Sequence, residues 1–157
     1  MVLKTRIDAQ EGRQDLIITR NFEIPVDLVF RAYTEAEFFE QWMGTKVITL
    51  DARKNGSYRF ETSNPAGIVV FRGSGVIHEC IRDNKIIRTF EMEDTSFEPQ
   101  MEFLQFTRLT DDTSRLTIHT IYKTPELRDA MLKLPFAQGL NMAHNKLESI
   151  FQNRPEN

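Results

Sequence analysis

The sequence predicts an α+β fold in which one long amphipathic helix is laid on an antiparallel sheet. The middle of the chain, from Thr45 to Tyr122, consists of short β-rich runs separated by turn residues. The links between these runs are of hairpin length, which favours antiparallel pairing. The stretch 136–152 instead has apolar residues at spacings of four and three, the period of a helix with one buried face. We therefore expect about seven strands, with a pair of short helices between the first and the second.

The N-terminal region predicts one strand followed by a helix. Residues 1–14 carry little periodicity, and we expect a loose lead-in there. The run 16–24 is rich in β-forming residues and is expected to be the first strand. Pro25 interrupts this run and suits the first turn of a helix. Apolar residues at helical spacing then indicate that helix, namely Val26, Val29, Phe30 and Tyr33.

A second short helix is expected from Glu35 to Trp42. Thr34 is the expected N-cap, and Glu37, three residues later, would complete a capping box with it. Gly44 is expected to end this helix, because glycine readily takes the left-handed conformation found just beyond helix C-termini.

Turn residues divide the middle region into strands. Asn55 and Gly56 form one such turn, in which Asn55 suits a positive φ, and the segment 64–67 forms another. Gly73 and Gly75 fall inside the longest predicted strand, where we expect them to allow a bend or bulge in a curved sheet. The strands are expected at about 45–51, 57–63, 68–80, 85–93, 101–109 and 115–122.

The C-terminal region predicts a short helix and then a long one. Thr124 is the expected cap of the short helix, with Pro125 in its first turn, and Pro135 stops it after Lys133. Met142 falls on the face of the long helix opposite its apolar stripe. The stripe consists of Phe136, Leu140, Ala143, Leu147 and Ile150 with Phe151.

Composition excludes several classes of protein. The chain has 157 residues, so we expect one domain over 1–157 with its core at about 16–152. Its net charge is −3, with both signs interspersed, so it lacks the basic face that nucleic acid requires. The start of the chain is polar and no run approaches the roughly 20 apolar residues that span a bilayer, so membrane insertion is not expected. The single cysteine, Cys80, fits a reducing compartment, and we expect the cytoplasm.

Side chains that often carry chemistry are scattered along the chain. The three histidines, His78, His119 and His144, lie on different predicted elements and lack the spacing of a metal site. Cys80 has no base or helix start near it in sequence, so a buried apolar role is expected. No phosphate-binding glycine loop or nucleophile elbow is present either. The sequence thus predicts no metal, no cofactor and no catalytic motif.

Alternation along the strand 85–93 separates the two faces of the sheet. One set of alternate residues contains Glu91 and Glu93 and is expected to face water. The other set places Arg88 inward, among apolar neighbours. Two interpretations of Arg88 follow. Either it pairs with an acidic side chain or extends to the rim of the core, or it orients the anionic or carbonyl group of a ligand in a cavity.

Short fragments that recur in order carry a family resemblance. They are Val29 to Thr34, Gln41 to Gly44, Asp51 to Phe60, Arg128 to Leu132, and Gly139. Together they resemble the family named for the activator of Hsp90 ATPase, within the START-like, helix-grip (SRPBCC, Bet v 1-like) superfamily. The resemblance implies a curved antiparallel sheet of about seven strands wrapped on the long C-terminal helix, with an apolar cavity between them. At 134–136 and at His144 the sequence differs from the residues that are common in the family. Both differences fall on the helix that would roof this cavity, so no particular ligand carries over from a relative.

These observations favour a protein that binds a small apolar or amphipathic molecule between the sheet and the last helix. One alternative is a protein-interaction module of the chaperone-cofactor type, with a protein partner. The other is a polyketide-cyclase-like enzyme in which Arg88, Tyr58 and His144 assist the reaction. His144 is expected at the cavity edge if it is functional and half-exposed otherwise. The expected ligand-binding residues are Trp42, Tyr58, Phe60, Arg88, Phe90, Met92, Leu104, Phe106, Ile118, Phe136, Leu140 and His144.

Overall fold

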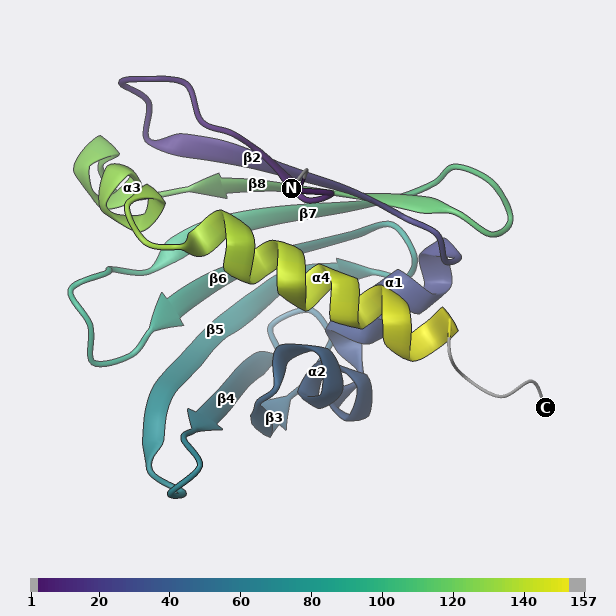
Figure 1. The fold of residues 1–157 in the computed structure, drawn as a ribbon, viewed down its shortest axis with the longest axis horizontal. Coiled ribbons are helices and arrows are strands. Elements are labelled where there is room, and N and C mark those ends of the chain that lie inside the picture. The colour runs from purple at the N-terminus through teal and green to yellow at the C-terminus, as the bar shows by residue number, and fades with distance from the viewer. Residues whose placement is uncertain (1–2, 153–157) are drawn as a thin grey trace.

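The computed structural model describes residues 3–152, which form the α+β fold that the sequence predicts. An antiparallel sheet of eight strands, in the order β1-β2-β8-β7-β6-β5-β4-β3, curves around the C-terminal helix (Figure 1). The elements are β1 (Arg6–Asp8), β2 (Asp15–Phe22), α1 (Val26–Thr34), α2 (Ala36–Met43), β3 (Lys46–Leu50), β4 (Ser57–Ser63), β5 (Val69–Ile81), β6 (Lys85–Met92), β7 (Gln100–Arg108), β8 (Ser114–Ile121), α3 (Pro125–Leu132) and α4 (Phe136–Gln152).

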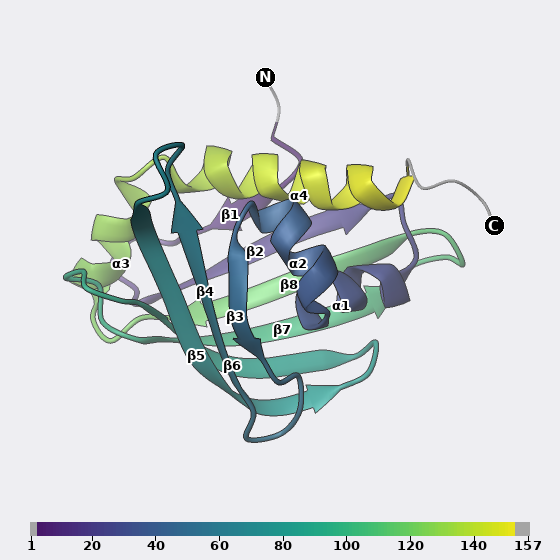
Figure 2. The ribbon, with the colours of Figure 1, turned by 90° about the horizontal axis from the view of Figure 1, so that it is seen from below.

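The helices close the concave side of the sheet. Figure 2 shows the strands as a trough, with α4 running along its open side. The helices α1 and α2 lie toward one end of α4, and α3 lies beyond its other end (Figures 1 and 2).

The turn residues in the sequence correctly predict where the middle strands begin and end. Each strand from β3 to β8 begins and ends within a residue or two of its predicted position. Asn55 has a φ of 66°, as the turn before β4 requires. Neither Gly73 nor Gly75 forms a bulge, because the register shifts on either side of them fall at Thr62/Ser63 and at Ile77/Glu79. Gly73 lies opposite Phe60 and Gly75 lies opposite Tyr58 on the neighbouring strand β4.

The predicted helix ends at Gly44 and Thr124 are confirmed, and the predicted cap at Thr34 is not. Gly44 ends α2 in the left-handed conformation, and the Thr124 hydroxyl accepts a hydrogen bond from the Leu127 amide at the start of α3. The capping box at Thr34 is wrong, because α1 continues through Thr34 and its hydroxyl donates to the Phe30 carbonyl. The N-cap of α2 is Glu35, whose extended backbone separates the two helices without a side-chain cap.

The expected loose lead-in is wrong for residues 3–14, and residues 1–2 lie outside the described part of the chain. Arg6–Asp8 pairs with β2 as the edge strand β1, which brings the sheet to eight strands rather than about seven. Thr5 is buried, and the Asn141 side-chain oxygen on α4 accepts hydrogen bonds from the amides of Lys4 and Thr5. This pairing uses backbone groups and a side chain distant in sequence, so it leaves no apolar periodicity in residues 1–14.

The long helix packs through the stripe that the sequence indicates. Leu147 has no exposed surface and Phe151 is buried, whereas Met142 on the opposite face is 69% exposed. The buried face is wider than predicted, because Asn141, His144 and Glu148 are also buried, against polar partners near β1 and β2. Within residues 3–152, no helix is long and apolar enough to cross a membrane.

Candidate functional site

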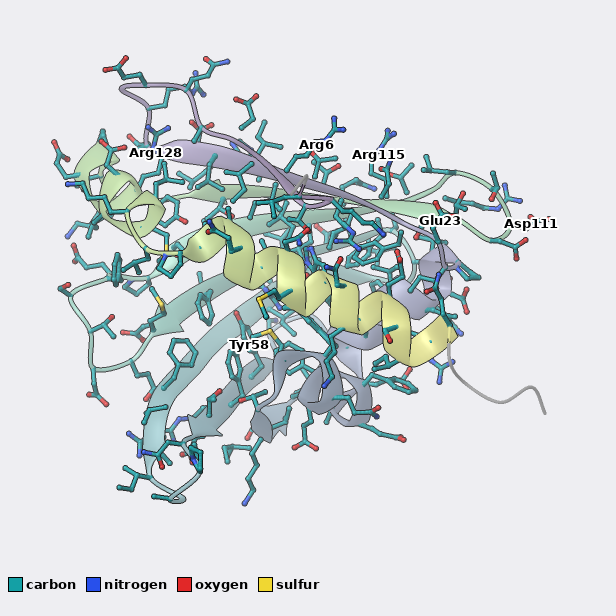
Figure 3. All side chains as sticks on the ribbon, viewed as in Figure 1. Arg6, Glu23, Tyr58, Asp111, Arg115 and Arg128 are labelled. Atoms are coloured by element: carbon teal, nitrogen blue, oxygen red, sulfur yellow. The ribbon has the colours of Figure 1, made fainter. Side chains whose placement is uncertain are left out.

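A cavity lies between α4 and the concave face of the sheet. Its volume is about 420 Å³, within the range of pockets that hold small organic molecules. Figure 3 shows Tyr58 among the side chains that fill the region beside α4. The strands contribute Ile18, Tyr58, Phe60, Phe71, Arg88, Phe90, Met92, Gln100, Glu102, Ile118 and Thr120 to its lining. The helices and the segment after β8 contribute Tyr33, Phe39, Trp42, Met43, Tyr122, Met131, Phe136, Gly139, Leu140 and Ala143.

Aromatic rings form one wall of the cavity. Phe60 on β4 and Phe90 on β6 lie parallel, with an interplanar angle of 7° and centroids 6.1 Å apart. Phe39 of α2 meets Phe60 edge-on. The strand between the two parallel rings carries Gly73, where an added Cβ would lie 2.5 Å from Phe60 and 2.7 Å from Phe90. A side chain at this position would therefore push the rings apart, so Gly73 is needed for their arrangement.

A second glycine makes room for Tyr58. The Tyr58 hydroxyl donates a 2.6 Å hydrogen bond to the Thr89 carbonyl on β6, across the intervening strand β5. A Cβ on Gly75 would lie 2.0 Å from that carbonyl oxygen and 2.8 Å from the Tyr58 hydroxyl. Gly75 therefore lets the tyrosine reach over β5. This fixes the Tyr58 ring against the cavity, where it also contacts Arg88.

The cavity has a polar floor, which we define as Arg88, Gln100, Glu102 and Thr120. Arg88, Glu102 and Thr120 are direct partners on the adjacent strands β6, β7 and β8, so their side chains lie in one row across the sheet. The Arg88 Nε donates to the Glu102 Oε1 at 2.9 Å, and the Gln100 Nε2 donates to the Glu102 Oε2 at 2.8 Å. The side chains of Arg88 and Glu102 are only 13% and 11% exposed. Of the two interpretations of Arg88, the structure thus shows pairing with an acid.

Two tyrosines flank the charged pair. The Arg88 guanidinium carbon lies 5.1 Å from the centre of the Tyr58 ring and 5.6 Å from that of Tyr33. Burial lowers the pKa of Arg88, but Tyr58, Glu102 and Tyr33 together outweigh it and leave the pKa above its ordinary value. Burial raises the pKa of both tyrosines. All three groups therefore keep their ordinary protonation at neutral pH, with one positive charge on Arg88.

Glu102 lines the cavity and pairs with Arg88, but it is absent from the ligand-binding residues expected from the sequence. The signal was present, because Glu102 precedes Leu104 by two residues and must share its inward face. The cross-strand register that puts Glu102 opposite Arg88 depends on the hairpin between β6 and β7, which is long and irregular. Periodicity alone identifies the face but not the partner.

Most of the expected ligand-binding residues line the cavity. They are Trp42, Tyr58, Phe60, Arg88, Phe90, Met92, Ile118, Phe136 and Leu140. Leu104 and Phe106 face inward but lie in the packed core, outside the lining of the cavity. Phe106 packs edge-on against Phe30 and Tyr33, because α1 covers this end of β7. Alternation places both residues on the correct face without showing where along the strand the cavity ends.

The expected position of His144 is wrong in both of its forms. His144 is completely buried, neither half-exposed nor part of the cavity lining. Its Nδ1 lies 2.9 Å from the Thr5 hydroxyl and its Nε2 lies 3.1 Å from the Tyr33 hydroxyl. Burial, followed by the positive charge of Arg20, lowers its pKa to about 3. A histidine that is neutral at pH 7 and held by two hydroxyls serves to join α4 to α1 and to the N-terminal segment.

A buried ion pair lies behind His144. Arg20 on β2 is fully buried, and its Nη2 lies 3.7 Å from the Glu148 Oε2 of α4. The same carboxylate oxygen accepts a 2.9 Å hydrogen bond from the Glu23 amide. Arg20 Nη1 also contacts the Thr5 hydroxyl at 3.3 Å and the Asn141 Oδ1 at 3.5 Å. These contacts fix α4 over β2, and none of the side chains involved lines the cavity.

The remaining candidate groups are apart from the cavity. Within residues 3–152, no group of three or more metal-ligating side chains comes together. His119 on the outer face pairs with Asp15 at 2.8 Å, and hydrogen bonds from Arg13 and then His119 hold the pKa of Asp15 below its usual range. Cys80 is half-buried, and burial raises the pKa of its thiol. Its surroundings therefore do not activate a nucleophile.

Solved structures share this fold over nearly its full length. A crystallised protein from Mycobacterium smegmatis is 21% identical, with a TM-score of 0.81, and the match covers 94% of this chain and 97% of the other. A protein from Rhodobacter sphaeroides is 18% identical, with a TM-score of 0.81 and coverage of 96% and 100%. A solution structure from Arthrobacter aurescens is 14% identical, with a TM-score of 0.83 and coverage of 96% and 93%. At these identities the similarity shows the fold, and it confirms the helix-grip prediction.

Sequence comparison adds the family. A search of curated proteins found no match. The family model described as "Activator of Hsp90 ATPase homolog 1-like protein" matches residues 23–152, which span α1 to α4 and include every residue of the polar floor. This match extends over most of the chain and agrees with the fragments that carry the resemblance. The chain therefore belongs to the family of activator of Hsp90 ATPase homolog 1-like proteins.

Proposed function

We propose that this protein binds a small apolar or amphipathic molecule in the cavity between α4 and the sheet. The observation that carries the proposal is the cavity itself, about 420 Å³ in volume, with aromatic walls and a short row of polar groups on its floor. Pockets of this design bind by burying apolar surface and orient the ligand through a few polar contacts. Membership of a family that often binds hydrophobic ligands supports the proposal.

The arrangement of the candidate catalytic residues favours binding over catalysis. Of the three, Arg88 and Tyr58 line the cavity, but His144 does not. Both ring nitrogens of His144 already lie within hydrogen-bonding distance of the hydroxyls of Thr5 and Tyr33. A general base needs to reach the proton that it removes, and His144 lacks that access. The polar groups of the cavity are therefore proposed to orient a ligand.

A dye titration on matched variants tests this proposal. N-phenyl-1-naphthylamine is uncharged and apolar, and its fluorescence rises when it leaves water. Ala143→Phe places a ring in the cavity lining, whereas Met142→Phe places the same ring on the exposed face of the same helix. We expect the wild type and Met142→Phe to bind the dye, and Ala143→Phe to bind it at least tenfold more weakly.

The control for folding is the far-ultraviolet circular dichroism and melting temperature of each variant. If Ala143→Phe does not fold, Gly139→Phe replaces it, because Gly139 also lines the cavity and a Cβ there meets no atom within 4 Å. A folded variant of either kind that binds the dye as well as wild type would show that the cavity is not the binding site.

A further inference from the structure

We propose that the polar floor selects an uncharged, hydroxyl-bearing aromatic molecule and rejects carboxylates. This inference rests on the proposed function and names the class of ligand. From the sequence alone, Arg88 could either pair with an acidic side chain or anchor an anionic or carbonyl group of a ligand. The structure shows the pairing, because Glu102 supplies the negative charge that Arg88 requires.

The charges already present on the polar floor disfavour a carboxylate ligand. Arg88 and Glu102 form a contact of 2.9 Å, and Gln100 holds the second carboxylate oxygen of Glu102 in place. A carboxylate ligand that approached Arg88 would therefore lie close to the fixed carboxylate of Glu102. The site would then carry two negative charges and one positive charge in a poorly solvated cavity, where repulsion is weakly screened. A cationic ligand would be repelled in the same way by the positive charge of Arg88.

A hydroxyl group matches the hydrogen-bonding groups that remain. Among residues 3–152, the Arg88 guanidinium makes its hydrogen bond through Nε, which leaves its Nη nitrogens as donors. The carboxylate oxygens of Glu102 each accept one hydrogen bond and retain further lone pairs. A hydroxyl can accept from Arg88 and donate to Glu102 at the same time, with no change in net charge. A hydrocarbon would leave both groups desolvated without a new partner.

The walls favour a flat aromatic body for the same ligand. Phe60 and Phe90 present parallel rings, and Tyr58 is fixed against the floor by its hydrogen bond to Thr89. Trp42 on α2 also lines the cavity, with its indole N–H donating to the Ala32 carbonyl at 2.8 Å. These rings are held by packing or by hydrogen bonds. Offset stacking on preformed rings favours a planar ligand.

Two naphthalene derivatives of nearly the same shape test the selection. The uncharged 2-naphthol and the anionic 2-naphthoate are titrated into the wild-type protein at pH 7 by isothermal calorimetry. We expect 2-naphthol to bind at least tenfold more tightly. In Glu102→Gln the charge of Arg88 is no longer balanced, and we expect the preference to reverse in favour of 2-naphthoate. Glu91→Gln removes a carboxylate from the exposed side of the same sheet and should leave the wild-type preference unchanged.

The outcomes separate this inference from the proposed function. If the wild type binds 2-naphthoate as tightly as 2-naphthol, or more tightly, the selection by charge is wrong although the cavity binds ligands. If Glu102→Gln folds but keeps the wild-type preference, Glu102 does not set it, and the inference also fails. If neither naphthalene compound nor the uncharged dye binds, the proposed function itself fails. Should Glu102→Gln not fold, the wild-type preference tests the selection: tighter binding of 2-naphthol supports it, and equal or tighter binding of 2-naphthoate overturns it.

Discussion

Arg88 and Glu102 form an ion pair on the polar floor of the cavity. Their contribution to the stability of the fold depends on both being present. Removing one partner of a buried pair leaves an uncompensated charge, which is costly, whereas removing both costs little. We predict that Arg88→Met lowers the free energy of unfolding by roughly 3–5 kcal/mol, because Glu102 is then left unpaired. The double variant with Glu102→Met should recover most of that loss in urea unfolding. If Arg88→Met alone is as stable as the wild type, the two residues do not depend on each other for stability, and the prediction is wrong.

His144 makes the free energy of unfolding depend on pH. Its pKa is about 3 in the folded protein against an ordinary 6.5, so between these values the unfolded chain binds a proton that the folded chain does not. Stability is therefore lost as the pH falls from 6.5 toward 3, with a slope of up to roughly 1.4 kcal/mol per pH unit from this residue. We predict that His144→Gln reduces this slope while lowering stability at pH 7.

The measurement is urea unfolding at several pH values between 4 and 7. His78→Gln is the matched control, because His78 is exposed and should leave the slope unchanged. Carboxylates also titrate in this range, so the informative quantity is the difference between variant and wild type. An unchanged slope in His144→Gln would contradict the assignment of a neutral, buried His144.

At the scale of elements, α4 supplies one wall of the core and the roof of the cavity. Leu147 on its inner face has no exposed surface, whereas Met142 on its outer face is 69% exposed. We predict that Leu147→Ala costs about 2–5 kcal/mol of stability and that Met142→Ala costs well under about 1 kcal/mol. Thermal or urea unfolding of the two variants provides the comparison. Equal losses would mean that the packed face of α4 is assigned incorrectly.

Local signals predict the elements better than the contacts between them. The strands from β3 to β8 are delimited by turn residues that act over a few positions, so their bounds could be read from the sequence. The edge strand β1 could not, because its pairing depends on β2 and on Asn141, far away in the chain. Gly73 and Gly75 show the same limit, since their role lies in rings on neighbouring strands.

At the scale of the whole molecule, the inward-facing residues were largely predictable and the cavity boundary was not. Alternation identifies which side of a strand faces α4, which is why Phe60, Phe90 and Met92 line the cavity as expected. Whether an inward residue meets the cavity or the packed core depends on where α1 and α4 cross the strands. That long-range arrangement explains the different positions of Phe106 and His144.

The methionines offer a direct test of where a ligand binds. Met43, Met92 and Met131 line the cavity, whereas Met142 is exposed on the outer face of α4 and Met101 lies on the outer face of β7. Because three of these side chains face the cavity and two face outward, ¹³C-methyl labelling of methionine provides both probe and control in one sample.

The most direct measurement is therefore a methyl correlation spectrum recorded during titration with 2-naphthol. Ring currents from a bound aromatic molecule shift only methyl groups that lie close to it. The proposed binding site predicts saturable shifts at Met43, Met92 and Met131, with Met101 and Met142 unchanged. Shifts confined to Met101 or Met142, with the three cavity methyl groups unmoved, would contradict ligand binding in the cavity.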